Sequence, residues 1–578
     1  MSKRLRLSLV PLVLAACTHQ APSTSPDMAS SSRSTGDLTQ DERIRQVLNR
    51  LTFGARPGDA SAVAAMGIER WIDAQLSPRT IADANAEAVL ASMETQRKQV
   101  FELIADHPDP QEVQQRINQR RAAQARANAS GAVVPVSFSG ADSLSLRRAQ
   151  QTTNQLVGQI TSAKLVRAVW SERQLQEVMT DFWENHFSVF LGKSPNRYSM
   201  IEYDRDVIRP RALGHFRDLL GAVAKSPQML FYLDNWQSGV DSVHANILEQ
   251  RIEARRVNSN DPLARTLATL PRRRARGLNE NYARELMELH TLGVDGGYTQ
   301  KDVQEVARAL TGWTIDAPNL GGSFVFRPEQ HDADEKVVLG HVLRAGRGIE
   351  DGEEVLDILA RAPATAHFIA TKLARHFVSD DPPPALVDRC ASTFRKTDGD
   401  IAETLRCIVT SPEFFNRSAY RAKVKTPFEL VASALRALGA PADTTPRSAQ
   451  LVNQLGQPIF GRLTPDGWPD RGEAWMNSGA IMNRINFGFR LAAGQIPGVR
   501  IANWAPGVRL RQLPYDKQVD GVIDELLGGG VSPETRRILS TGENPLVASN
   551  APMKNVPQLT GLPAVVGLAL GTPEFQRR

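Results

Sequence analysis

Apolar residues recur at intervals of three and four along most of the chain, the spacing that places them on one face of an α-helix. The windows 40–51, 60–76, 81–105 and 161–200 show this most clearly. The pattern predicts a mainly α protein, a multi-helix globular body in which strands have a small part.

Strand-like alternation is confined to two short runs, residues 323–327 and 337–340. Alternation with a period of two places apolar side chains on one face of a strand. We expect the two runs to pair with each other as a small β-hairpin excursion around the polar segment between them.

A short pattern recurs at residues 218–229, 403–414 and 564–575. In each copy an apolar helical run leads into Ser-Pro or Thr-Pro, and a methionine or phenylalanine follows two residues after the proline. A hydroxyl at this place can cap the next helix, whose first position suits proline. We expect a repeated structural joint rather than a functional site.

The first residues have the order of an export signal. Three basic residues among the first six precede a short apolar run that ends at Ala16. The run is too short to span a bilayer, which requires roughly 20 apolar residues. Because its end, Leu-Ala-Ala-Cys17, resembles the lipobox of bacterial lipoproteins, we expect cleavage of residues 1–16 and lipid on Cys17. The alternative is an ordinary cleavable signal with a coincidental cysteine.

Composition divides the rest of the chain. Residues 17–40 begin with a stretch rich in Ser, Thr, Pro and Ala and are expected to form a flexible tether. Residues 41–578 follow as the mainly helical domain, with predicted insertions at 108–150 and 251–276. Thr18, in place of an acidic residue, follows the cysteine, which favours the outer membrane of the cell envelope if the host is diderm.

The net charge gives no indication of a nucleic-acid partner. It is +6 for the full chain at pH 7, and removal of the three basic residues of the predicted signal leaves about +3 for the mature part. No second long apolar segment follows the signal. The mature part is therefore expected to be a globule that is attached to the membrane through its lipid.

Cys390 and Cys407 are the cysteines that remain after lipidation. Helical periodicity places them on two neighbouring predicted helices, residues 384–394 and 401–410, joined by a turn-like Thr-Asp-Gly-Asp. Export to an oxidising compartment would allow a disulfide between them if their Cα atoms come within about 7 Å. Two buried free thiols are the alternative.

The densest polar segment spans residues 277–300 and reads GLNENYARELMELHTLGVDGGYTQ. Together with Leu-Thr-Gly-Trp313 and His331-Asp332, it resembles the central signature of the bacterial family called domain of unknown function 1800. The other recurring motifs of that family have similar counterparts, in the same order, at residues 51–54, 182–187, 210–227, 233–235, 425–427, 455–458 and 465–469.

This resemblance implies an exported bacterial protein, but no particular reaction. Genes of the family often neighbour those of a second exported family, domain of unknown function 1501, which looks related to sulfatases and alkaline phosphatases. A member of that second family is the expected protein partner.

The signature segment places polar residues on two sides of a helix. At about 100° per residue, Leu286 falls on the apolar face and His290 at its edge. Glu280, Arg284 and Glu288 fall on the opposite side. They form either an exposed charge ladder or a buried polar network.

Two helices are expected to bury one histidine each, His186 and His290. Each histidine belongs to a Glu-x-His sequence, but residues i and i+2 lie about 200° apart on a helix and cannot face one ion. A shared metal would need both histidines and a loop ligand, so we assign no metal site. The favoured state is a core histidine that is hydrogen-bonded to Asn185 or Asn279, while Glu184 lies on the polar face.

The loop 327–336 adds imidazole and carboxylate groups that suit acid/base chemistry or ligand binding. Gly-x-Ser-x-Gly, His-Glu-x-x-His and paired Cys-x-x-Cys motifs are missing from the sequence, so common hydrolase and zinc mechanisms lose support. The candidate catalytic residues are His186, Glu280, Arg284, His290, His331 and Asp332. With Asn185 they make seven, of which we expect at least four within about 10 Å of one another around one cavity.

Three functions are consistent with these residues. The first, favoured by the lack of a known catalytic motif, is a lipid-anchored helical scaffold or binding protein that works with an exported partner. The second is a hydrolase of an envelope or extracellular polymer, with the candidates around one pocket. The third is a metal- or cofactor-dependent redox protein that uses the same histidines. The sequence decides neither the cofactor nor whether the chain is an enzyme.

Overall fold

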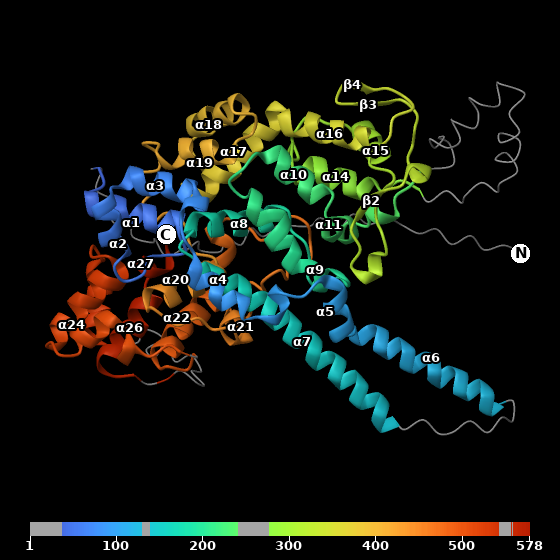
Figure 1. Ribbon diagram of the computed structural model, residues 1–578. Helices are drawn as coiled ribbons and strands as arrows, with labels where there is room; N and C mark the ends of the chain where they lie inside the picture. Colours follow the sequence, from blue (N-terminus) through green and yellow to red (C-terminus); the bar gives the residue numbers. More distant parts are fainter. Residues whose placement is uncertain (1–36, 130–138, 241–276, 497, 543–556, 558) are drawn as a thin grey trace, which may run out of the picture. The chain divides into compact units, whose positions relative to one another are not determined.

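The computed structural model describes residues 37–129, 139–240, 277–496, 498–542, 557 and 559–578, and these residues are mainly helical, as predicted (Figure 1). The predicted signal, the tether up to residue 36 and the predicted insertion 251–276 lie outside the described residues. None of the described helices is long and apolar enough to cross a membrane.

The first helices show how local sequence sets helix ends. Their bounds are α1 (Gln40–Leu51), α2 (Asp59–Met66), α3 (Ile68–Leu76), α4 (Ala84–Ala91), α5 (Val100–Asp106), α6 (Pro110–Ala129) and α7 (Ser139–Trp170). α1 has the predicted bounds because Thr39 and Glu42 form a capping box at its start. Gly67, at φ 89°, breaks the window 60–76 into α2 and α3. The window 81–105 is likewise two helices, α4 and α5, rather than one.

The remaining helices complete the body. The middle of the chain contributes α8 (Gln174–His186), α9 (Asn196–Glu202), α10 (Phe216–Ala224), α11 (Pro227–Tyr232), α14 (Glu280–Glu288), α15 (Gln300–Ala309), α16 (Ile349–Arg361) and α17 (Pro363–Phe377). The C-terminal part contributes α18 (Pro384–Lys396), α19 (Ile401–Val409), α20 (Pro427–Ala437), α21 (Pro446–Gln454), α22 (Ser478–Ala492), α23 (Ala505–Leu510), α24 (Tyr515–Val522), α25 (Pro533–Thr541), α26 (Gly561–Gly571) and α27 (Pro573–Gln576).

Both predicted runs contain strands, but the predicted pairing is wrong. β2 (Phe324–Phe326) pairs antiparallel with β1 (Trp313–Ile315), and β3 (Lys336–Val338) pairs with β4 (His341–Leu343). Leu339 and Gly340, both at positive φ, make a two-residue turn between β3 and β4. Each run therefore finds a partner close by in the sequence and does not need the other.

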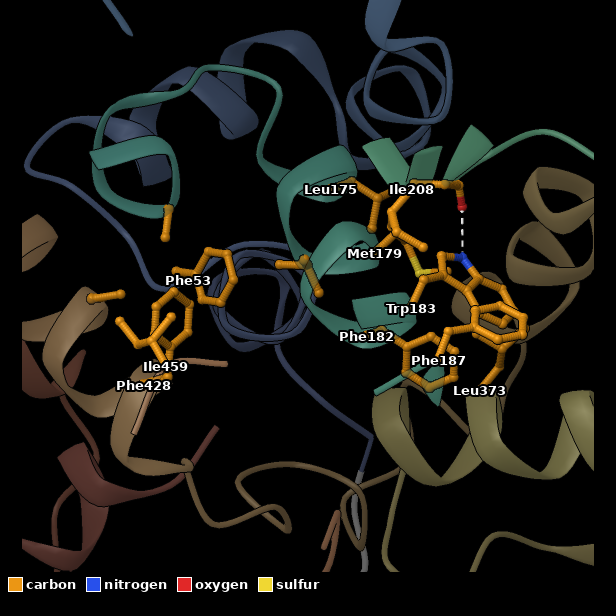
Figure 2. Packing of buried hydrophobic residues seen from close by; sticks show 14 of the residues in the cluster. Phe53, Leu175, Met179, Phe182, Trp183, Phe187, Ile208, Leu373, Phe428 and Ile459 are labelled. Carbon is orange, nitrogen blue, oxygen red and sulfur yellow. Dashed lines mark hydrogen bonds between the residues drawn. The ribbon is translucent and has the colours of Figure 1, made fainter. Parts of the chain in front are cut away.

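α8 carries a dense part of the apolar core (Figure 2). The Trp183 side chain is fully buried, and its indole N–H donates to the carbonyl of Ala212 at 2.9 Å. The ring centroids of Phe182 and Phe187 lie 4.9 and 5.8 Å from that of Trp183. Burial of such a ring stabilises the fold by roughly 2–3 kcal/mol. This packing fixes which face of α8 is left for polar contacts.

All three Ser/Thr-Pro joints have the predicted hydrogen bond, but a helix follows at Ser226 and Thr572, whereas turns follow at Ser411. In each, the hydroxyl accepts a hydrogen bond from the backbone N–H three residues later, at 3.1–3.3 Å: Ser226 from Met229, Ser411 from Phe414 and Thr572 from Phe575. The three donor residues are buried. The pattern is therefore a repeated structural joint.

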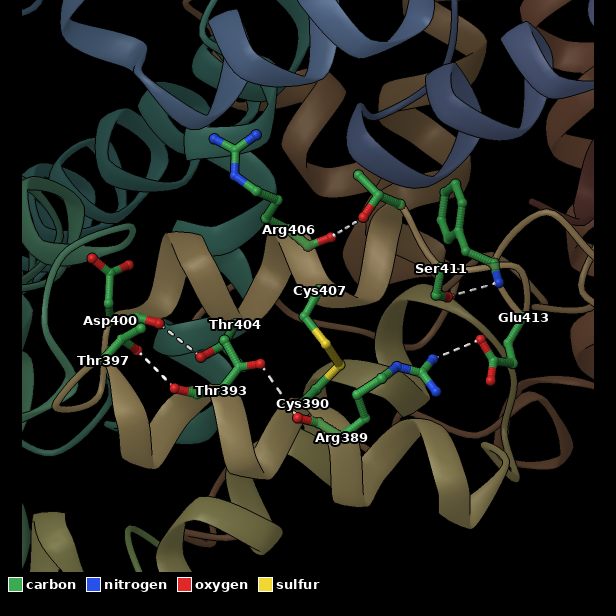
Figure 3. Close-up of a disulfide and its surroundings, with 12 residues drawn as sticks. Arg389, Cys390, Thr393, Thr397, Asp400, Thr404, Arg406, Cys407, Ser411 and Glu413 are labelled. Carbon is green, nitrogen blue, oxygen red and sulfur yellow. Dashed lines mark hydrogen bonds and ion pairs between the residues drawn. A yellow bond between two sulfur atoms is a disulfide. The ribbon is translucent and has the colours of Figure 1, made fainter.

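The hairpin of α18 and α19 contains a disulfide between Cys390 and Cys407, whose Cα atoms lie 5.7 Å apart (Figure 3). Asp400 begins α19 by accepting a hydrogen bond from the backbone N–H of Glu403 at 2.8 Å. The disulfide therefore links two helices, α18 and α19, that already pack side by side.

Candidate functional site

A cavity of about 250 Å³ combines charged, amide and aromatic side chains. Its lining comes from α7, α8 and the residues just after α8, from α17, the start of α20 and the segment 457–471. Its charged and imidazole side chains are Lys164, Asp181, Glu184, His186, Lys372, Arg375, His376, Glu429, Arg462, Asp466, Asp470 and Arg471. Apolar walls with a few convergent polar groups are typical of a small-ligand site.

His186, at the end of α8, links this cavity to the signature segment. Its Nε2 lies 3.0 Å from the backbone oxygen of His290, and its Nδ1 lies 2.8 Å from Nζ of Lys372. Because a carbonyl oxygen can only accept, Nε2 carries the proton and Nδ1 accepts from Lys372. Burial, assisted by the charge of Lys372, holds the pKa of His186 well below its ordinary value, so the ring is neutral.

Lys372 itself has an unusual environment. Burial lowers the pKa of its amine to about 8, against the opposing effect of Asp470. At neutral pH most of the amine is still charged. One of its N–H groups is used by His186, which leaves two for other partners.

Both asparagines that were expected to bind a histidine have other partners. Asn185 donates to the backbone oxygen of Trp468 at 2.8 Å and accepts from the backbone N–H of Trp468 at 2.6 Å. Asn279 caps α14 by accepting from the N–H of Tyr282 at 3.0 Å. A side-chain amide has both a donor and an acceptor, so it suits a peptide group or a helix end better than a single ring nitrogen.

Glu184, expected on the polar face of α8, is only 6% exposed. Lys164 Nζ lies 2.6 Å from Oε2 of Glu184 and 2.6 Å from Oδ1 of Asp181. Burial raises the pKa of Glu184 to about 8. Burial alone would lower the pKa of Lys164, but the two carboxyl groups raise it above its ordinary value. Asp181 thus balances the charge of Lys164, and Glu184 is protonated at neutral pH.

One oxygen of Glu184 is left without a hydrogen bond. Within the described residues, Oε1 of Glu184 is buried and has no hydrogen-bond partner. A protonated carboxyl group can donate one hydrogen bond. Glu184 can therefore offer a proton or a hydrogen bond to a molecule in the cavity.

A second acid/base pair in the lining was missed by the sequence analysis. Nδ1 of His376 donates to Oδ2 of Asp470 at 2.8 Å, and Lys423 Nζ lies 2.8 Å from the other oxygen. Burial alone would raise the pKa of Asp470, but His376 and Lys423 hold it well below its usual range. The feature of the sequence that could have indicated this pair is the family-like motif at 465–469, which ends one residue before Asp470.

His290 lies next to the cavity but is not among its lining residues. It is 2% exposed, and its ring centroid is 6.3 Å from that of His186. Burial, with a contribution from Lys372, lowers the pKa of His290 to about 3. Of the six candidates, His186 and His290 are the pair that direct contact brings together here.

Glu280 and Arg284 lie on the partly exposed side of α14, as the helical phase predicted. Both contact Gln300 on α15: its amide donates to Glu280 at 2.6 Å and accepts from Arg284 at 2.7 Å. Glu288 accepts from the hydroxyl of Tyr298 at 3.0 Å. These contacts join α14 to the following segment, and neither Glu280 nor Arg284 lines the cavity.

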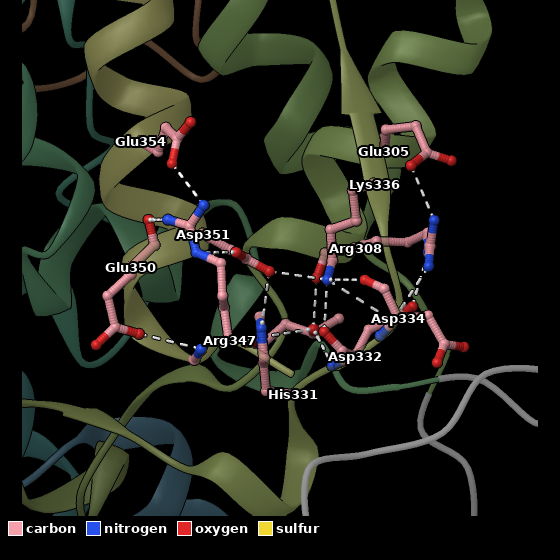
Figure 4. Close-up of polar contacts among 12 residues, drawn as sticks. Glu305, Arg308, His331, Asp332, Asp334, Lys336, Arg347, Glu350, Asp351 and Glu354 are labelled. Atoms are coloured by element: carbon pink, nitrogen blue, oxygen red, sulfur yellow. Dashed lines mark hydrogen bonds and ion pairs between the residues drawn. The ribbon is translucent and has the colours of Figure 1, made fainter. Parts of the chain in front are cut away.

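His331 and Asp332 belong to a buried ionic network (Figure 4). Asp332 binds Arg308 at 2.7 Å, and Lys336 binds Asp351 at 2.9 Å. His331 Nδ1 donates to the backbone oxygen of Thr311 at 2.8 Å, while its Nε2 lies 3.4 Å from Asp351. The network fastens the β-strands to α15 and α16.

The expected gathering of at least four of the seven polar residues around one cavity is not found. Asn185 and His186 line the 250 Å³ cavity, and the other five do not. The physical reason is that the ionic network uses His331 and Asp332 and the contacts with Gln300 use Glu280 and Arg284, while His290 is buried against His186. Among the described residues, no group of three or more His, Cys, Asp or Glu is placed to hold a metal ion.

The molecule is thus a mainly helical protein with a polar cavity between helices. Residues 46–577 match the family described as Protein of unknown function (DUF1800). Because the match covers nearly the whole chain, the chain belongs to this family. Comparisons with curated proteins and with solved structures found no significant match.

Proposed function

We propose that this chain is a lipid-anchored binding protein of the cell envelope that holds a small polar ligand in the cavity beside α8 and α17. The observation that supports binding is the unused hydrogen-bonding capacity of Glu184 and Lys372 in that cavity. A buried polar group without a partner costs about 1–3 kcal/mol. A ligand that bonds these groups would offset this cost.

The binding site can be tested on the purified mature chain. Native mass spectrometry should show a small molecule that is bound after purification from the envelope and lost in a Lys372→Met, Glu184→Gln double variant. Circular dichroism would check that the variant is folded. Two results together would contradict the proposal. The wild-type chain would carry no small molecule, and no member of a library of sugars, amino acids and organic acids would raise its melting temperature.

The anchoring part of the proposal rests on residues 1–17. Cys17→Ala should abolish the incorporation of labelled fatty acid and leave the precursor uncleaved or the mature part released. Unchanged labelling would contradict it. Co-purification from the envelope would test the second part, a partner from the exported family domain of unknown function 1501.

A hydrolase is the second candidate, and a specific observation favours it. Glu184 has a raised pKa and Asp470 a lowered pKa, and both line the same cavity. Enzymes separate the pKa values of two carboxyl groups in this way to obtain an acid and a base. Chromogenic glycosides and esters would test it: Glu184→Gln should lower kcat by roughly 10²–10⁴-fold, the usual contribution of a general acid. No turnover by the wild type would remove this candidate.

A further inference from the structure

The charges of the cavity lining are unevenly matched. Each acidic side chain in the lining lies within 2.8 Å of a cationic group: Asp181 and the protonated Glu184 share Lys164, Asp466 has Arg462, Asp470 has Lys423, and Glu429 has Arg578. Lys372 and Arg375 also line the cavity, yet neither forms an ion pair with a carboxylate of the described residues. The unmatched charge of the lining is therefore positive and lies on α17.

The two cations are arranged to act together. Lys372 and Arg375 are three residues apart on α17, so their side chains leave the helix on the same side. Nε of Arg375 donates to the backbone oxygen of Asp380 at 3.0 Å, which fixes the guanidinium group. His186 fixes Lys372 but, being neutral, cannot balance its charge. Both heads are held in place by contacts that supply no negative charge.

We infer that the ligand of this cavity carries a small anionic group, a carboxylate, phosphate or sulfate, which binds Lys372 and Arg375 together. This inference rests on the proposed binding function. An anion offsets the cost of holding two positive charges in a partly buried site, and hydrogen bonds between ionised groups are about twice as strong as neutral ones. A guanidinium group adds a fork that fits two oxygens of such an anion.

The other residues of the lining indicate what the rest of the ligand is like. Phe182, Phe428 and Phe460 contribute apolar and aromatic surface. The volume, about 250 Å³, is slightly below the usual range of ligand pockets, about 300–1,000 Å³. A compact molecule with an apolar face and one anionic end fits these features.

Benzoate and benzamide make a matched pair of probes, because they have nearly the same shape and differ in charge. Isothermal titration of the full mature chain at pH 7 should give a dissociation constant for benzoate at least ten times lower than for benzamide. Phenyl phosphate and benzenesulfonate, titrated alongside, would show which anionic group is preferred. Inorganic phosphate and sulfate would show whether the anion binds without an apolar body.

Single substitutions then test which side chains bind the anion. Lys372→Met and Arg375→Met should each weaken benzoate binding at least tenfold, and Lys372→Arg should restore part of it. Arg389→Met is the matched control, because Arg389 lies on α18 outside the cavity lining and is paired with Glu413, and it should change the affinity less than threefold. Circular dichroism melts would exclude a loss of fold.

The outcomes separate the inference from the proposed function. Equal binding of benzoate and benzamide, or benzoate binding that survives both α17 substitutions, would overturn the anion site while leaving a binding cavity. Failure of every probe to bind the wild-type chain at 10 mM, roughly the weakest binding worth considering, would overturn the anion site. The proposed binding function would be contradicted only by a different result: the purified chain would carry no bound molecule, and no compound in the library would stabilise it.

Discussion

The ionic network around Asp351 and the cavity beside Lys372 both bury charged groups, but they satisfy them differently. In the network, Lys336 meets Asp351 and Asp332 meets Arg308, so each charge has a partner from the chain itself. In the cavity, Lys372 meets a neutral histidine. The comparison teaches that buried polarity marks a ligand site only where the chain leaves its groups incompletely bonded.

The largest expected effect breaks the network. Asp351→Ala would leave Lys336 buried without its carboxylate and should lower the free energy of unfolding by about 3–5 kcal/mol. Lys372→Met removes a charge that has no carboxylate partner and should change it by less than about 1 kcal/mol. Urea unfolding of both variants at pH 7 measures the difference. Equal losses would show that the two regions are alike.

The second prediction concerns acid. The folded pKa of His290 is about 3, below the ordinary value of about 6.5, so the unfolded chain binds its proton first as the pH falls. The contribution of His290 to the free energy of unfolding is complete above about pH 6.5 and is lost as the pH falls towards 3. Between pH 7.5 and 5 the chain should lose about 2 kcal/mol through His290, and His186, whose pKa is also lowered, should add to this. Urea unfolding at the two pH values would measure it, and His290→Gln should remove its share.

The third prediction concerns alkali. Glu184 has its pKa raised to about 8 in the folded chain, so its contribution is full at low pH and is lost as the pH rises through the folded value. Glu184→Gln cannot titrate and should gain roughly 1–2 kcal/mol relative to the wild type between pH 7 and 9. Parallel unfolding curves for the two chains are the measurement. A constant difference would mean that Glu184 is ionised throughout.

The smallest effect is expected on the partly exposed side of α14. Arg284→Ala removes a contact with Gln300 and should change the free energy of unfolding by less than about 0.5 kcal/mol. The same urea experiment applies. A loss above about 2 kcal/mol would place Arg284 with the network rather than at the surface.

The features that the sequence predicted are those that depend on neighbouring residues. The cap at Thr39, the Ser/Thr-Pro joints and the helices that carry Cys390 and Cys407 follow from local spacing. The predicted strand pairing was wrong because each run has a nearer partner that the alternation did not mark: residues 313–315 for β2 and, across the Leu339-Gly340 turn, residues 341–343 for β3.

The candidate site was harder to predict because its partners are distant in the sequence. The burial of Glu184 depends on Lys164, twenty residues earlier in the chain. Lys372 lies 186 residues from His186 and belongs to no recognised motif. The convergence of such residues depends on packing, and a periodic pattern cannot reveal it.

The hydrogen bonds that run from Lys372 through His186 to the carbonyl of His290 have a direction, because each donor and acceptor is fixed. The imidazole of His186 is therefore a built-in reporter of the cavity. Its Nδ1 resonance in a ¹⁵N spectrum should move when Lys372 loses or gains a partner, while Nε2 stays protonated. Occupancy could thus be followed from inside the protein, without a label on the unknown ligand.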